Sequence, residues 1–542
     1  MPPHHTWSER LERIPQAYST AFLVCAAFLV YAGSIPAGYV FDDEFAILGN
    51  PVVQGQVPLW EAFLRDFWGR SPHSPDAIGT YRPLPLLLLG IEWRLSHGAA
   101  WAMHLGNVLW HCGAIACFVL AFAPLAGRRL ALAAAALASV MSAPAEAVQA
   151  IVGRADLMCT VFVLLTLYFH RRSGAGATFA AAAFLGLALG SKESAVAILP
   201  VLWGLDRLIR PDSGRKPTRF LVYGSVLVVY VLLRAQAVGA TFEPRIDPQS
   251  NPLILAAPLE RFLGAGRIFL ERYIAGIIDP GRRLYECSAM ACGPATPDDV
   301  LAWAGVALAL CLVLLPVLLW RRAPLVAAGV FWFICFFLPV SNFLVLSPSL
   351  YGERLLYLPM LGGALATTTL AEALARRLAR PALAWGLVAT AGLANLAALQ
   401  LRHWDWRTDA ALYVSAIEHV DTSAKVHKNL AVVLSQEEDW PAAEYHARRA
   451  LELWPDNVTT RPILGAALAM QGRAGEAEAE FRQALEAAPR GSVVCPFAIF
   501  LARQKRFTEA LTLMHAHAGA TANAPECHGL AEKLSSAVGT AR

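Results

Sequence analysis

The chain contains about eleven apolar segments, each close to the roughly 20 residues that an α-helix needs to cross a lipid bilayer. We predict spanning helices at 16–36, 99–126, 130–149, 155–170, 176–191, 193–209, 219–238, 300–320, 324–342, 355–375 and 382–402. Only 16% of the 542 residues are charged and the mean hydropathy is +0.46, whereas a soluble protein carries charge on about a quarter of its residues. The sequence therefore predicts an all-α, polytopic membrane protein.

Basic residues gather in alternate loops between these segments. With the N-terminus in the cytoplasm, Arg128, Arg171, Arg207, Arg321 and Arg376 all fall on the cytoplasmic side, as the positive-inside rule requires. The opposite, outer side then holds "FDDEF", "EAVQAIVGRAD", "GSKES", the loop 239–299 and "SPSLYGERLLYLP". Within the long first outer connector, "LWEAFLRDFW" is typical of an amphipathic helix that lies in the membrane interface. The net charge of +4 reflects this topology, and no nucleic-acid partner is expected.

After residue 403 the composition changes, and an internal repeat begins. Residues 425–457 and 459–491 match at a period of 34, and a degenerate third copy, "CPFAIFLARQKRFTEALTLMHAHA", follows. This is the period of tetratricopeptide (TPR) repeats, which are helix–turn–helix units that stack into a solenoid. We predict a membrane domain at 1–403, a linker or first helix at 404–420, and an extracytoplasmic TPR domain at 421–542.

Four of the ten cysteines lie outside the predicted spans, in two pairs. Cys287 and Cys292 lie in an outer loop, and Cys495 and Cys527 lie in the repeat region. In an oxidising compartment each pair could form a disulfide, and the alternative is that all four are unpaired thiols. The cysteines within spans are interpreted as small buried hydrophobic residues.

Three acids, Asp42, Asp43 and Glu44, stand together beside the first span in "YVFDDEFAILGNP". Like charges so close together resist joint ionisation, which makes the cluster costly. One reading is that Asp42 or Asp43 is a general base that deprotonates an acceptor hydroxyl group. The alternative reading is that an Asp caps the next helix. The apolar flanks and the cations on the same side favour the first reading.

Four cations are predicted to share this outer side: Arg82, Arg154, Lys192 and Arg354. Arg presents a planar fork of donors that suits phosphate, and Lys provides a point charge. Singly, a boundary Arg commonly extends to the interface or forms a structural pair. Together they predict a cavity for an anionic substrate embedded in the membrane.

His104, Asn107 and His111 recur at helical spacing and are expected on one face of the second span. They could line the cavity, or they could form interhelical hydrogen bonds. A divalent metal bound by Asp42, Asp43 or the two histidines is conceivable, but the spacing demands none, so no metal site is predicted. The expected lining of the cavity is Glu44, His104, Asn107, His111, Glu193, Tyr351 and Glu353.

Taken in order, the motifs resemble a known family. "FDDEFAILGNP", "YRPLPLLLLGIEW", "HLGNVLWH", "VGRADLMCTVFVLLTLYFH", "GSKESAVAILPVLWGLD" and "YGERLLYLPMLG", followed by TPR repeats, resemble the transmembrane-and-TPR family of protein O-mannosyltransferases and its bacterial relatives. The motifs cover about residues 20–400, and their order is more specific than any one of them.

The resemblance implies a glycosyltransferase of the GT-C fold. Such an enzyme moves a sugar, generally with inversion, from a polyprenyl-phosphate donor to an acceptor at the outer or lumenal leaflet, without a required cofactor. An Asp of "FDDEF" would be the base, with Asp42 aligned to the first acid of the family's pair. Arg354 would be a candidate for binding the lipid phosphate, assisted by Lys192 and Arg154. The TPR groove would bind a protein acceptor.

Two departures from the family's pattern affect the expected location and the expected sugar. The repeat array is short and the helices are Ala-rich, which is typical of a bacterial inner-membrane protein with a periplasmic TPR domain. An undecaprenyl-phosphate sugar other than mannose would then also fit. Two other functions remain open: the same chemistry with a lipid or cell-surface glycan as acceptor, and a non-catalytic membrane scaffold.

Overall fold

The computed structural model describes residues 14–71, 79–208, 218–239, 250–282, 292–378, 380–521 and 529–540, together with residues 246, 248 and 527. These residues form helices and loops, and no strand occurs among them. The predicted all-α fold is therefore confirmed for the part of the chain described. The chain divides into two compact units, the first of which ends at Ala411 and the second of which begins at Leu412.

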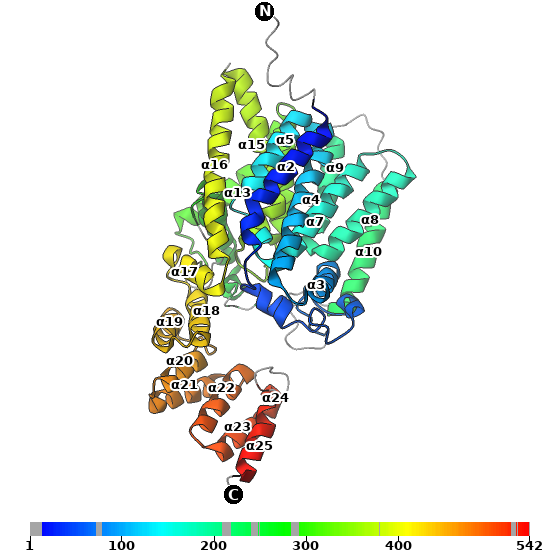
Figure 1. The fold of residues 1–542 in the computed structure, drawn as a ribbon. Helices are drawn as coiled ribbons and strands as arrows, with labels where there is room; N and C mark the ends of the chain where they lie inside the picture. The colour runs from blue at the N-terminus through cyan, green and yellow to red at the C-terminus, as the bar shows by residue number, and fades with distance from the viewer. Residues whose placement is uncertain are drawn as a thin grey trace, which may run out of the picture. The chain divides into compact units, whose positions relative to one another are not determined.

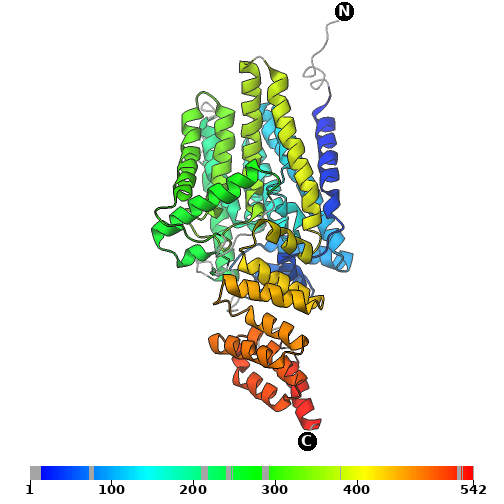
Figure 2. The same ribbon diagram turned by 90° about the vertical axis from the view of Figure 1, so that its left-hand side faces the viewer.

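The first unit is a bundle of helices that run side by side (Figures 1 and 2). Its longest described helices are α2 (Gln16–Tyr31), α4 (Ala100–Ala126), α7 (Arg154–His170), α10 (Thr218–Val238), α13 (Val300–Leu319), α15 (Tyr357–Arg377) and α16 (Pro381–Asp405). Some of these are extended by adjoining helical turns, and in the described residues seven such helices are long and apolar enough to cross a membrane. The chain is therefore an integral membrane protein.

The other predicted spans contain shorter helices: α5 (Arg128–Val140), α8 (Ala175–Ser191), α9 (Ile198–Leu208) and α14 (Pro324–Phe337). The prediction of one continuous helix at 130–149 is wrong, because α5 stops at Val140 and a separate short helix, α6 (Glu146–Gln149), follows. Pro144 lies between the two, and a proline disfavours helical conformation in the residue before it. The total of about eleven spans stays a prediction.

The predicted amphipathic helix at "LWEAFLRDFW" is also wrong. Only a short 3₁₀ helix, Leu59–Phe63, forms before α3 (Pro83–Ser96). The carboxylate of Asp66 accepts hydrogen bonds from the backbone N–H groups of Trp68 at 3.1 Å and Arg70 at 2.8 Å. Such local bonds compete with a helix for the same N–H groups, and the chain turns at this point.

Between α10 and α13, the chain forms α11 (Pro258–Ile268) and α12 (Ala275–Ile278). Helix α11 packs against α13. Elsewhere in the unit, α4 packs against α2, α5 and α7, and α15 packs against α14. Gly329 of α14 faces Gly362 of α15 so closely that a Cβ added to Gly329 would lie 2.6 Å from the Gly362 carbonyl oxygen. Small residues let helix backbones approach in this way inside membranes.

The second unit contains helix pairs that follow the 34-residue period. Helix α17 (Asp409–His419) begins in the first unit, and the pairs are α18 (Ala424–Gln436) with α19 (Trp440–Leu453), α20 (Arg461–Met470) with α21 (Ala474–Ala487), and α22 (Gly491–Arg503) with α23 (Phe507–Ala516). The chain ends with α24 (Ala518–Thr521) and α25 (Leu530–Thr540). Equivalent ion pairs join successive helix pairs: Arg473 with Glu444 at 2.7 Å, and Arg506 with Glu478 at 2.6 Å.

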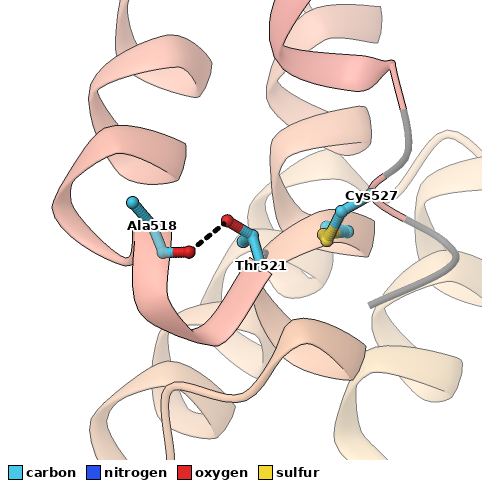
Figure 3. The surroundings of a disulfide bond; sticks show 4 residues. Ala518, Thr521 and Cys527 are labelled. Atoms are coloured by element: carbon cyan, nitrogen blue, oxygen red, sulfur yellow. Dashed lines mark hydrogen bonds between the residues drawn. A yellow bond between two sulfur atoms is a disulfide. The ribbon is translucent and has the colours of Figure 1, made fainter. Parts of the chain in front are cut away.

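A disulfide joins Cys495 of α22 to Cys527, with the two Cα atoms 5.5 Å apart (Figure 3). Thr521, near this bond, donates a hydrogen bond to the carbonyl oxygen of Ala518 at 3.2 Å. Cys292 is also disulfide-bonded, whereas Cys287 lies outside the described residues. The disulfide ties the last helices of the second unit to the third helix pair.

Candidate active site

The two aspartates lie in a tight turn in the loop after α2. This acidic turn, residues 40–43, is closed by a hydrogen bond from the N–H of Asp43 to the carbonyl oxygen of Val40 at 3.2 Å. Asp43 is 0% exposed, and its carboxylate accepts bonds from the N–H groups of Val40 (3.3 Å), Ile151 (3.3 Å) and Val152 (2.9 Å). Burial raises the pKa of Asp43 to about 7. Asp43 thus ties the acidic turn to the segment before α7.

Asp42 has a different environment. Its side chain is 20% exposed and lies 3.1 Å from Nη2 of Arg354. The Glu146 side chain, 1% exposed, accepts from Nη1 of the same arginine at 2.5 Å and from its backbone N–H at 2.9 Å. Because the buried Glu146 binds Nη1 of Arg354, the other terminal nitrogen, Nη2, is left to contact Asp42. A partly exposed carboxylate and a fixed cation therefore face each other.

Two further predicted cations lie in ion pairs of the same network. Nζ of Lys192 contacts Asp156 at 2.5 Å, and Nε of Arg82 contacts Glu193 at 3.1 Å. Burial lowers the pKa of Lys192, although the Asp156 carboxylate opposes the shift, and the positive charges of Arg82 and Arg354 lower it further. Lys192 is thus close enough to both arginines for the charges to interact, and the structure brings these three predicted cations together.

Arg154 differs from the other cations because it is wholly buried. Its three nitrogens donate to Asn107 at 2.5 Å, Glu92 at 2.6 Å and the carbonyl oxygen of Met103 at 2.8 Å. A Cβ added at Gly106 would lie 2.5 Å from the guanidinium, so this position on α4 leaves room for it. The side chain joins α3, α4 and α7, and each of its three nitrogens donates to a group within the protein.

The remaining predicted lining residues are mostly engaged in packing. His104 contacts the carbonyl oxygen of Gly38 through Nε2 at 2.9 Å, and His111 contacts the Tyr357 hydroxyl through Nδ1 at 2.7 Å. Asn107 donates to the carbonyl oxygen of Ala150 at 2.7 Å. The His111 bond joins α4 to α15, whereas the bonds of His104 and Asn107 join α4 to loop carbonyl oxygens. Among the other predicted residues, Glu353 pairs with Arg402, the ring of Tyr351 packs 4.8 Å from that of Tyr273, and Glu44 is exposed.

Sequence reasoning missed several partners. Glu146 lies within the quoted motif "EAVQAIVGRAD", and Glu92 lies within "GIEW", so a search for buried acids in those motifs could have found both. Asp409 accepts a hydrogen bond from the N–H of Phe41 at 2.7 Å across 368 positions, and no local pattern signals that contact. Within the described ranges, no group of three or more His, Cys, Asp or Glu side chains could hold a metal ion.

Comparison with known proteins finds similar sequences that share one description. No protein-family model matches the chain. It is 28% identical over 447 residues to "Protein O-mannosyl-transferase F38B6.6" of Caenorhabditis elegans, which covers 80% of this chain and 62% of that protein. It is 27% identical over 489 residues to human "Protein O-mannosyl-transferase TMTC4", covering 79% of this chain and 66% of that protein.

Mouse "Protein O-mannosyl-transferase TMTC3" is 23% identical over 524 residues, which cover 86% of this chain and 54% of that protein. The chain therefore spans between about half and two thirds of the length of these relatives. The resemblance to the transmembrane-and-TPR protein O-mannosyltransferases is confirmed over about four fifths of the chain.

Proposed function

We propose that the chain is an integral-membrane glycosyltransferase of GT-C type, which moves a sugar from a polyprenyl-phosphate donor to a hydroxyl group of a protein acceptor. The observation that carries this proposal is the 3.1 Å contact between Asp42, which is partly exposed, and Arg354, which is also bound to the buried Glu146. A base and a phosphate-binding cation are the two groups that the reaction needs. The names of the similar proteins favour mannose as the sugar and a protein as the acceptor.

In this mechanism the donor phosphate takes the place of the Asp42 carboxylate on Arg354, which stays held by Glu146, and the carboxylate is freed. Asp42 then takes the proton from the acceptor hydroxyl group as the oxygen attacks the anomeric carbon. The bond from that carbon to the phosphate oxygen breaks, and the polyprenyl phosphate leaves with its electron pair. Attack from the opposite side inverts the anomeric centre, through a transition state with oxocarbenium character.

The leaving phosphate gains negative charge, which fixed cations stabilise. Arg354 is the first such cation, because its guanidinium is held in place before the donor arrives. Lys192 and Arg82 contribute positive potential from their ion pairs with Asp156 and Glu193. Arg154 is assigned a structural role instead, since it is wholly buried and each of its nitrogens donates to a group within the protein.

We assign different roles to the two aspartates. We assign Asp42 as the base because it is the partly exposed member of the pair. Asp43 is assigned to hold the loop, because it is buried and accepts three backbone hydrogen bonds. A carboxylate enclosed in this way has no route to an acceptor hydroxyl group.

The repeat pairs of the second unit are proposed to be a TPR solenoid that recruits the acceptor. The recurring Arg–Glu ion pairs between successive helix pairs support a regular stack of repeats. The Cys495–Cys527 disulfide supports a location in an oxidising compartment, since disulfides are rare in the cytosol. On this proposal, donor, acceptor and repeats all lie on the outer side of the membrane.

Intact-mass spectrometry of envelope proteins tests the proposal. Cells that make the wild type are compared with cells that make Asp42→Asn and with cells that make Asp298→Asn, a matched change at an exposed loop carboxylate. We expect specific proteins to lose a hexose-sized mass only in Asp42→Asn. Unchanged protein masses with an altered glycolipid profile would point to a lipid or glycan acceptor, and no change in either would support a scaffold.

A further inference from the structure

The segment that follows α16 is bonded both to the acidic turn and to Gly38, just before it, through backbone N–H groups. The N–H of Gly38 donates to the carbonyl oxygen of Arg407 at 3.2 Å, and the N–H of Phe41 donates to Oδ1 of Asp409 at 2.7 Å. At 2.7 Å, the Asp409 bond is at the short end of the usual N–H···O range. A carboxylate from the other end of the membrane unit therefore holds the residue that immediately precedes Asp42.

Phe41 has a backbone conformation that its side chain disfavours. Its φ angle is +59°, in the left-handed region that bulky residues rarely enter. Residues held in this region persist only where the surroundings over-determine them. The short bond to Asp409 supplies such a constraint, because it fixes the direction of the Phe41 N–H.

The conformation of Phe41 sets the direction of Asp42. The acidic turn is held at its far end by Asp43, whose carboxylate accepts from Ile151 and Val152. It is held at its near end by the Phe41–Asp409 bond, and Asp42 lies between the two anchors. If Phe41 relaxed to a negative φ, the chain would rotate at Asp42 and the carboxylate would leave its position opposite Arg354.

We propose that Asp409 is a positioning residue for Asp42. It keeps Phe41 in the left-handed conformation and so aims the base, without touching donor or acceptor. This inference rests on the proposed function. Helix α17 begins at Asp409, so a protein truncated after residue 420 keeps the bond while losing the repeats.

The test is a double-mutant cycle in the full chain, with polyprenyl-phosphate mannose as donor. Asp409→Ala removes the acceptor oxygen, and we expect the transfer rate kcat to fall roughly tenfold with an unchanged Kd for the donor. Asp409→Asn keeps an acceptor oxygen and should retain most of the rate. Glycine enters the left-handed region freely, so Asp409→Ala should have less than about a threefold effect in a Phe41→Gly background.

Hydrogen exchange provides a readout that does not require transfer. The Phe41 amide should be protected in the wild type and in Asp409→Asn, and it should exchange faster in Asp409→Ala. The positioning role is overturned if Asp409→Ala transfers at the wild-type rate, if Asp409→Asn is as slow as Asp409→Ala, or if the loss is equal in the Phe41→Gly background.

Failure of the proposed function gives a separate result. A wild type that transfers no sugar to any acceptor would overturn the proposed function and, with it, the positioning role. In that case exchange at the Phe41 amide would still report whether Asp409 holds the turn. Normal transfer by the wild type with no effect of Asp409→Ala would overturn the positioning role alone.

Discussion

Replacing each aspartate of the acidic turn by asparagine should give two different defects. Asp42→Asn removes the proposed base, and we expect transfer to fall by roughly 10²–10⁴-fold. Its effect on stability should be small, because a partly exposed ion pair contributes at most about 1 kcal/mol and an Asn oxygen can still accept from Arg354. Asp43→Asn should instead destabilise the protein.

The magnitude for Asp43→Asn follows from its hydrogen bonds. An Asn oxygen placed at the Oδ2 position could still accept from Val40 and Ile151, but its NH₂ group would then face the N–H of Val152, which now bonds at 2.9 Å. Leaving one buried donor without its acceptor costs about 1–3 kcal/mol. The opposite orientation of the amide would lose two bonds.

The Asp43→Asn defect should also depend on pH. Burial raises the pKa of Asp43 from its ordinary value to about 7, so the folded state binds a proton that the unfolded state releases between about pH 4 and pH 7. This carboxyl group therefore stabilises the fold at low pH, and the contribution is lost as the pH rises through 7. The stability gap between wild type and Asp43→Asn should therefore be larger at pH 5 than at pH 8.

Thermal unfolding in detergent and transfer to an acceptor peptide, both measured at pH 5 and pH 8, would check the two variants. Asp298→Asn serves as the exposed control. The reasoning is refuted if Asp43→Asn loses transfer at unchanged stability while Asp42→Asn remains active, because the roles of the two carboxylates would then be exchanged.

Three further predictions concern the loop before α7 and the second unit. Gly153→Ala should lower both stability and transfer, because the added Cβ would overlap the backbone of α6. The control is Gly176→Ala, whose added Cβ would meet only open space, and this variant should have no effect. Equal behaviour of the two variants would contradict the packing argument. Burial lowers the pKa of His427 and of His446, whose Nδ1 atoms lie 2.9 Å apart. The folded state therefore favours the neutral rings. This contribution to stability is present above the ordinary histidine pKa and is lost as the pH falls below that value. Hydrogen-exchange protection of α18 and α19 should therefore be lower at pH 5 than at pH 7.5, and equal protection would refute this sign. Deleting residues 421–542 should abolish transfer to protein acceptors but leave donor hydrolysis detectable, and full transfer by the truncated protein would exclude recruitment by the repeats.

Several features were predictable because they depend on local sequence. Runs of apolar residues predict helices whatever their neighbours are, and each predicted span does contain one. The errors occurred where single residues override the average: Pro144 lies in the break between α5 and α6, and Asp66 bonds the backbone N–H groups of Trp68 and Arg70. A hydropathy window averages over such single residues.

The grouping of the polar motifs was also predictable, because helices that cross in alternate directions return every second loop to the same side. Arg82, Lys192 and Arg354 accordingly share one charge network. Their individual partners were not predictable. Arg154 carries the same charge in an equally polar motif, yet Glu92, Asn107 and Met103 take up its donors.

The sequence by itself determined the class of protein: its apolar segments require a membrane, its period of 34 predicts a repeat domain, and its ordered motifs identify the relatives. Only the tertiary structure distinguished Asp42 from Asp43. The two are adjacent and chemically identical, so no pattern along the chain separates them. What differs is which segments pack around each carboxylate, with Ile151 and Val152 enclosing Asp43 and Arg354 facing Asp42. Because a carboxylate can act on a substrate only where the fold leaves it accessible, contacts between distant parts of the chain decide which one can be the base.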